Sequence, residues 1–374
     1  MPVQFVSTRG EAPAASFEEV LLSGIASDGG LYVPSTWPSI KGGVRSLTGA
    51  GFAEVAARVM APFADGCFDD DELSQLTQAA YDTFAHPSVV PLRQLGPDDW
   101  LLELFHGPTL AFKDVAMQLL SRMFEAVLAR RQTTMTILCA TSGDTGAAAV
   151  GALKGRRNIH LVVLHPKGRV SEVQRRQMTT VDDDNVTNIA IEGTFDDCQK
   201  LVKAMFADRE FAETYALAAV NSINWVLIAA QASYYVFSGL AIGGGVRPPA
   251  YSVPSGNFGD VYAGYVAHRM GLAIDHLIVA TNRNDILARF FSSGRYAAER
   301  VHPTISPSMD IQIASNFERL LFDVFGRDGS KVAHTMERFA ETRSFELGQD
   351  RLKELGELFA SARIEELETL SIIA

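Results

Sequence analysis

One lysine in this sequence lies in a segment that could make its side-chain amine reactive. Lys113 closes an apolar stretch that follows Gly107 and Pro108, and the Gly-Pro turn is expected to open a helix. Apolar surroundings lower the pKa of a lysine, and the neutral amine is the form that attacks a carbonyl carbon. A lysine of this kind is more often a surface residue paired with a neighbour, here Asp114, so the segment by itself is only suggestive.

A second segment has the composition of an anion-binding turn. Residues 139–147 read as a strand, a turn of small residues and the start of a helix, with Ser142, Asp144 and Thr145 in the turn. The N–H groups and the positive dipole end at a helix N-terminus suit a carboxylate or a phosphate, and the two hydroxyls are extra donors. The alternative is a purely structural helix cap, which uses the same residue types.

A third segment, residues 253–261, repeats the order of strand, glycine-bearing loop and helix. Gly256 and Gly259 on either side of Asn257 and Phe258 allow backbone N–H groups to converge on a phosphate, and Asp260 follows. A tight turn without a ligand is the alternative. Together the three segments offer an amine for a carbonyl and two helix N-termini for anions. An aldehyde cofactor that carries a phosphate, used on an anionic amino acid, needs this combination.

Alternating strands and helices must position these segments. Strands are expected at residues 135–140, 160–165, 251–254 and 276–280, and helices at 146–154, 196–207 and 223–240, which predicts parallel strand–helix–strand units. Amphipathic stretches at 51–61 and 71–84 predict a largely helical N-terminal region, residues 1–92. We expect two α/β domains after it: 93–240, with the lysine and the first loop, and 241–374, with the second loop. Residues 241–249 read as a linker.

The C-terminal region is expected to be helical. After Ser330 the sequence is charged, and apolar residues recur at helical spacing from Arg351 to Ile373. The sequence stops at Ala374 within this pattern, so we expect a C-terminally shortened form of a longer protein.

Composition excludes several classes of partner. The net charge of −11 argues against a nucleic-acid binder, because such affinity depends on clustered Lys and Arg. Cys67, Cys139 and Cys198 are far apart and lack a CxxC spacing, so neither a disulfide framework nor a metal site is expected. No signal peptide and no membrane span is recognised, and the expected location is the cytoplasm.

The amino-acid sequence of these segments resembles that of the threonine synthase family. That family has the fold type II of pyridoxal-phosphate (PLP) enzymes, which tryptophan synthase β shares. The likeness runs from end to end of the chain. It is carried by the lysine segment at 105–114 and by STRG at 7–10, GIASDGGLYVP at 24–34, SGDTG at 142–146, NSINW at 221–225, GNFGD at 256–260, ATN at 280–282, ND at 284–285, SPSMD at 306–310 and SNFER at 315–319.

The resemblance implies a role for each candidate residue. Lys113 is implied as the catalytic lysine that holds PLP as a Schiff base, and Asp144 as a residue near the ring hydroxyl of the cofactor. The remaining implied contacts are the PLP-phosphate loop of Gly256, Asn257, Phe258, Gly259 and Asp260, and the substrate contacts Ser142, Thr145, Asn221 and Ser222.

Two positions depart from the family pattern. The family commonly has an arginine, taken to bind the substrate phosphate, two residues after the tryptophan of NSINW, and this chain has Leu227 there. A leucine cannot make a bidentate contact with phosphate, so Lys167, Arg169 and Arg283 are candidate replacements, each equally well explained as a surface charge. The family's C-terminal segment, which supplies a hydroxyl facing the pyridine nitrogen, also lies beyond the last residue here.

The resemblance implies a lyase of threonine biosynthesis that converts O-phospho-L-homoserine and water to L-threonine and phosphate, as a monomer or homodimer. Alternatives are another PLP lyase of the same fold, or a catalytically weakened phosphate-binding relative. A nucleotide-binding module is less favoured, because the sequence lacks both GxxxxGK[ST] and GxGxxG.

Overall fold

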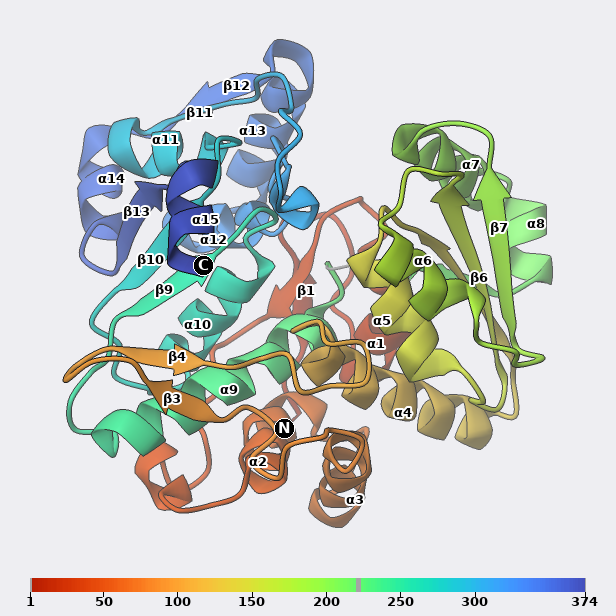
Figure 1. Cartoon of the computed structure of the whole chain (residues 1–374), viewed down its shortest axis with the longest axis horizontal. Helices are drawn as coiled ribbons and strands as arrows, with labels where there is room; N and C mark the ends of the chain where they lie inside the picture. The colour runs from red at the N-terminus through yellow and green to blue at the C-terminus, as the bar shows by residue number, and fades with distance from the viewer. Residues whose placement is uncertain (1, 220–222, 374) are drawn as a thin grey trace. The chain divides into compact units, whose positions relative to one another are not determined.

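The computed structural model describes residues 2–219 and 223–373, and its helices and strands are labelled in Figure 1. The chain divides into two compact units, each built from segments that are not contiguous in sequence. The first unit consists of Met1–Ser16, Ile25–Gly49 and Gln231–Ala374, and the second unit of Phe17–Gly24 and Ala50–Ala230. Helix α9 (Trp225–Gly243) begins in the second unit and continues in the first.

A four-stranded parallel sheet forms the centre of the second unit. Its strands lie in the order β7-β6-β5-β8, and their bounds are β5 (Met135–Ala140), β6 (Ile159–Pro166), β7 (Val186–Ile191) and β8 (Leu217–Ala219). The apolar side chains of β5 and β6 are mostly buried, as expected for strands of a parallel sheet that is covered on both faces. Helices α5 and α7 both contact these two central strands.

The remaining elements of the second unit are helices and one antiparallel strand pair. Figure 1 shows α4, α5 and α6 along one side of the sheet. The bounds are α1 (Phe17–Ser23), α2 (Phe52–Ala64), α3 (Asp70–Tyr81), β3 (Leu92–Gln94), β4 (Trp100–Leu102), α4 (Asp114–Arg131), α5 (Asp144–Leu153), α6 (Glu172–Thr179), α7 (Phe195–Ala207) and α8 (Arg209–Thr214).

The first unit is built around a smaller parallel sheet with the strand order β13-β10-β9. Two antiparallel pairs, β1-β2 and β11-β12, accompany it. The bounds are β1 (Phe5–Ser7), β2 (Tyr32–Pro34), η1 (Val44–Leu47), β9 (Tyr251–Pro254), α10 (Gly259–Arg269), β10 (Leu277–Thr281), α11 (Ile286–Ser293), β11 (Arg295–Ala297), η2 (Pro307–Met309), α12 (Phe317–Val324), α13 (Gly329–Thr342), β12 (Ser344–Glu346), α14 (Gln349–Leu355), β13 (Phe359–Arg363) and α15 (Glu366–Ile373).

The expected continuous helix from Arg351 to Ile373 is wrong. The segment contains a strand, β13, between α14 and α15, and β13 pairs in parallel with β10, with Phe359 opposite Leu277. The side chain of Phe359 is buried against Phe291 and Tyr265, with ring centroids 5.3 and 6.0 Å apart. Pairing with a strand some eighty residues earlier in the sequence overrides the helical spacing.

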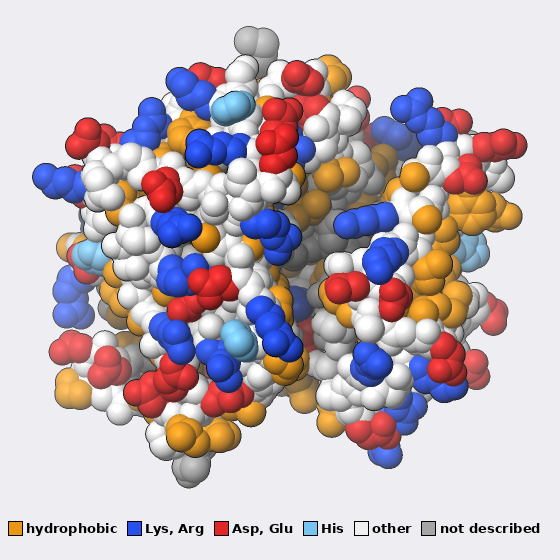
Figure 2. All heavy atoms as spheres, turned by 90° about the horizontal axis from the view of Figure 1, so that it is seen from above, with side chains coloured by type: hydrophobic (Ala, Val, Ile, Leu, Met, Phe, Trp, Pro, Cys, Tyr) orange, Lys and Arg blue, Asp and Glu red, His pale blue; other side chains and the backbone are white. Residues whose placement is uncertain are grey.

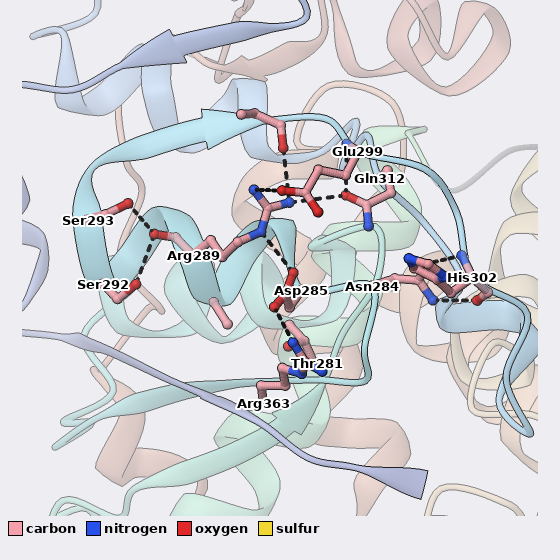
Figure 3. A network of polar contacts seen from close by, with 12 residues as sticks. Thr281, Asn284, Asp285, Arg289, Ser292, Ser293, Glu299, His302, Gln312 and Arg363 are labelled. Atoms are coloured by element: carbon pink, nitrogen blue, oxygen red, sulfur yellow. Dashed lines mark hydrogen bonds and ion pairs between the residues drawn. The ribbon is translucent and has the colours of Figure 1, made fainter.

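An ionic network holds the end of β13 to the start of α11 (Figure 3). The carboxylate of Asp285 accepts a hydrogen bond from Arg289 Nε at 2.8 Å through one oxygen and from Arg363 Nη1 at 3.1 Å through the other. Arg289 also forms an ion pair with Glu299 at 3.1 Å. A buried carboxylate therefore joins two elements that are distant in sequence.

Helix α9 is long and apolar enough to cross a bilayer by length and composition, but 78% of its most apolar 18-residue window is buried within the protein. That burial is typical of a core helix. On the face shown in Figure 2, Lys and Arg side chains alternate with Asp and Glu side chains, so that face carries no continuous basic surface.

Candidate active site

Lys113 immediately precedes helix α4, and its side chain is 18% exposed. Its Nζ lies 3.7 Å from Oδ2 of Asp144. Burial lowers the pKa of the Lys113 amine, and the neighbouring Asp144 carboxylate opposes that shift. The amine is therefore accessible and has an increased neutral fraction, as a carbonyl-binding lysine requires.

Asp114, the sequence neighbour of Lys113, has another partner. Its buried carboxylate accepts hydrogen bonds from the backbone N–H of Thr109 and from Thr109 Oγ1, both at 2.7 Å. A Cβ at Gly107 would overlap the Asp114 side chain, so the glycine is needed where the loop passes the carboxylate. Asp114 thus fixes the turn before α4, and Asp144 is the carboxylate that faces Lys113.

The loop before α5 is closed by Thr141. Its Oγ1 accepts hydrogen bonds from the N–H groups of Gly143 and Gly146, each at 2.9 Å. Ser142 is exposed and Thr145 is half-buried in the first turn of α5. Ser142 and Thr145, whose hydroxyls were predicted as donors, therefore lie on an ordered turn. Thr141, which orders the turn, was not among the residues predicted from the sequence.

The loop before α10 lies in the first unit and is held by its own neighbours. Asn257 accepts a hydrogen bond from the Ser315 N–H through its side-chain oxygen at 2.7 Å, and from the Asn316 N–H through its carbonyl at 3.3 Å. A Cβ at Gly256 would lie 3.0 Å from Cα of Met309. The close approach of these backbones explains the glycine.

Phe258 has a left-handed backbone, with φ of 64°, and its ring is fully buried. The ring packs edge-on against Phe317, with centroids 5.3 Å apart. A non-glycine residue in this conformation costs about 1–2 kcal/mol, and burial of the ring offsets that cost. The loop enters α10 with its backbone orientation fixed.

Asp260, in the first turn of α10, is held by two tyrosines of α9. Its Oδ1 accepts hydrogen bonds from Tyr234 Oη and from Tyr235 Oη, the latter at 2.9 Å. Burial raises the pKa of the Asp260 carboxyl, and the two hydroxyls oppose that rise by donating to the charged form. The carboxylate is therefore engaged with α9, and the backbone N–H groups at the start of α10 are the groups suited to an anion.

These features fit PLP. A partly exposed amine with a lowered pKa suits the aldehyde, and a helix that begins at Gly259, three residues after Gly256, has N-terminal N–H groups that suit the phosphate. The structure brings Lys113 and Asp144 together in the second unit and orders the loop of residues 256–260 in the first.

The other candidates are less informative. Asn221 and Ser222 lie outside the described residues. Leu227 is 4% exposed in the first turn of α9. Among the possible replacement cations, Lys167 forms an exposed ion pair with Glu192; Arg169 and Arg283 are exposed.

Comparison with known proteins defines the class. A model described as "Pyridoxal-phosphate dependent enzyme" matches residues 84–347, and one described as "Threonine synthase N terminus" matches residues 4–81. The expected α/β architecture of PLP fold type II is confirmed, and the protein is a PLP-dependent enzyme.

Its relatives identify the family. Threonine synthase of Pseudomonas aeruginosa is 51% identical over 373 residues, which are 100% of this chain and 80% of that protein. A crystal structure of PLP-bound threonine synthase from Brucella melitensis matches with a TM-score of 0.95 and 49% identity, over 98% of this chain and 79% of that one. Human threonine synthase-like 2 is 34% identical over 97% of this chain and 76% of its own. The chain belongs to the threonine synthase family, a family of PLP-dependent lyases.

Proposed function

We propose that this protein converts O-phospho-L-homoserine and water to L-threonine and phosphate, with Lys113 as the catalytic lysine. The observation that carries the assignment of the site is the accessible Lys113 amine, whose pKa is lowered by burial, 3.7 Å from Asp144 in a chain that matches threonine synthases along its whole length. A surface lysine paired with its neighbour would show neither feature.

PLP, when bound, supplies an electron sink for the substrate carbons. The rest of the mechanism lies with the side chains of the protein. In our proposal Lys113 Nζ holds the cofactor and, when not attached to it, takes and returns the proton at the substrate Cα. Asp144 stabilises the protonated form of that amine, because an opposite charge within a few Å favours the charged state.

Anion binding is divided between the two loops. We propose that the N-terminus of α10, with residues 256–260, binds the PLP phosphate, and that the turn with Ser142 and Thr145 binds the substrate carboxylate. Asn221 and Ser222 are proposed contacts of the substrate phosphate. Asp260 contributes to this scheme by fixing α10 through Tyr234 and Tyr235.

The substrate phosphate is the contact with the least support in this chain. Leu227 is buried and apolar where the family pattern has an arginine, so affinity for a phosphorylated substrate is expected to be weak unless a cation such as Arg169 or Arg283 contributes. Cytoplasmic location and a monomeric or homodimeric state are part of the proposal.

The experiment is a turnover assay of the PLP-loaded protein with O-phospho-L-homoserine, in which threonine and inorganic phosphate are measured together. Equal amounts of both products, and their loss in Lys113→Ala, are expected. Formation of an oxo acid from serine or threonine without phosphate release would indicate another lyase of the same fold. PLP binding with no product from any of these amino acids would indicate a catalytically weakened relative.

A further inference from the structure

We propose that Gln174, on α6, is a positioning residue that orients Asp144 toward Lys113. The proposal rests on the function proposed above, and it adds a residue thirty positions from Asp144 in sequence. The sequence around Gln174 is polar and gives it the pattern of a solvent-facing helix residue.

The contact is direct. Gln174 Nε2 donates a hydrogen bond to Oδ1 of Asp144, and the other oxygen, Oδ2, is the one that lies 3.7 Å from Lys113 Nζ. The two oxygens of one carboxylate are therefore divided between an amide and the amine. Gly143 makes this approach possible, because a Cβ at that position would overlap the Gln174 side chain.

The orientation of the Gln174 amide is fixed by the start of its own helix. Ser171, the N-cap of α6, accepts a hydrogen bond from the Gln174 backbone N–H at 3.3 Å, and its hydroxyl donates to Gln174 Oε1 at 2.9 Å. With Oε1 occupied by a donor, the amide nitrogen is the atom directed to Asp144. The amide is therefore set to bind the ionised carboxylate.

The same helix also holds the loop before Lys113. Gln177, one turn after Gln174, donates from Nε2 to the carbonyl of Thr109 at 2.9 Å. Thr109 in turn fixes Asp114, the first residue of α4. Met178 is fully buried and ties α6 to the unit. Helix α6 thus contacts both segments that form the Lys113–Asp144 pair.

Few other groups act on the charge of Lys113. Burial raises the pKa of the Cys139 thiol to about 12, so Cys139 is neutral when the lysine titrates. The Phe112 ring lies 5.8 Å from Nζ. Among the residues that the structure describes, Asp144 is therefore the charged neighbour of Lys113. A change at Gln174 would alter the pKa of Lys113 through Asp144.

The test measures Lys113 in the full-length, cofactor-free protein, without substrate. An amine-directed reagent is applied over a range of pH, and the labelling rate of the peptide that contains Lys113 is followed by mass spectrometry. In Gln174→Glu a second carboxylate lies beside Asp144 and adds negative charge near Lys113. The apparent pKa of Lys113 should rise, slowing labelling at about pH 8 by roughly threefold or more, since one pKa unit is a factor of ten.

Gln174→Met keeps the length of the side chain and removes the amide. Asp144 is then no longer held, so we expect the labelling midpoint to move to lower pH. Val173→Ala, at a 67% exposed position of the same helix, is the matched control and should keep the parent midpoint. Equal melting temperatures in all four proteins would show that the shifts do not come from loss of structure.

Parent-like midpoints in both Gln174 variants would overturn the proposal. The experiment is independent of the proposed reaction. A protein that makes no threonine but shows the shifts would refute the proposed function and keep the positioning role of Gln174. An active protein with parent-like midpoints in both Gln174 variants would keep the proposed function and refute the positioning role.

Discussion

The two tyrosine hydroxyls on Asp260 offer a quantitative test of how the loop of residues 256–260, the proposed PLP-phosphate site, is held. The perturbation is removal of one or both hydroxyls in Tyr234→Phe, Tyr235→Phe and the double variant. Neither change leaves a large cavity, because phenylalanine keeps the ring and the buried packing of α9. The effect should therefore come from the hydrogen bonds to the carboxylate.

The magnitude follows from the charge of the acceptor. A hydrogen bond to a charged group contributes about 1.5–3 kcal/mol to stability. Each single variant should lose about that amount of unfolding free energy in urea, and the second removal should cost more than the first, since the buried Asp260 then has neither hydroxyl.

The loss should depend on pH in a defined direction. The hydroxyls stabilise the charged form of Asp260, so removing them raises its pKa further in the folded protein. The loss of unfolding free energy is fully present at pH values above the pKa of Asp260 in the folded double variant. It disappears as the pH falls through the lower pKa of Asp260 in the folded parent. The affinity for PLP, measured by absorbance after dialysis, should fall together with the stability.

Tyr262→Phe is the matched control on α10. The Tyr262 hydroxyl is fully buried and has no hydrogen-bond partner within the part of the chain that the structure describes. Its removal should leave stability unchanged or raise it. Equal effects of Tyr235→Phe and Tyr262→Phe would contradict this prediction. A loss of less than about 0.5 kcal/mol in the double variant, the spread of ordinary surface changes, would contradict it as well.

Two further predictions concern the substrate phosphate and the ionic network. Leu227→Arg should lower the Michaelis constant for O-phospho-L-homoserine about tenfold, because a guanidinium adds a charge-assisted contact. Leu227→Met should leave the constant unchanged. An unchanged constant in Leu227→Arg would show that the substrate phosphate is bound by other groups. Asp285→Ala should cost about 2–3 kcal/mol of unfolding free energy in urea, since it leaves two arginines without their shared carboxylate. Arg363→Met should cost less, because Arg363 is 45% exposed. Equal losses in the two variants would contradict this prediction.

The sequence predicted the elements in which local pattern and tertiary context agree. The apolar run of β5 was expected at residues 135–140 and that of β9 at 251–254, and both strands have these bounds in the structure. Helices α7 and α9 were also expected, although α9 continues to Gly243 instead of giving way to the expected linker. The three-part division at residues 92 and 240 stays a prediction.

The missed elements are those that depend on distant partners. Residues 359–363 were expected to be helical, because nothing local identifies the strand that pairs with β10. Gln174 and Thr141 were missed for a similar reason. An amide on a polar helix and a hydroxyl at the end of a strand acquire a role only when the fold brings Asp144 and the glycine N–H groups to them.

The most direct test of the central claim identifies the residue that holds the cofactor. The PLP-loaded protein is treated with borohydride, which makes the link between the cofactor and a lysine amine permanent, and the digested protein is analysed by mass spectrometry. We expect one modified residue, Lys113, and no modification in Lys113→Ala. Modification of a different lysine, or the same modified peptide pattern in the variant, would contradict it.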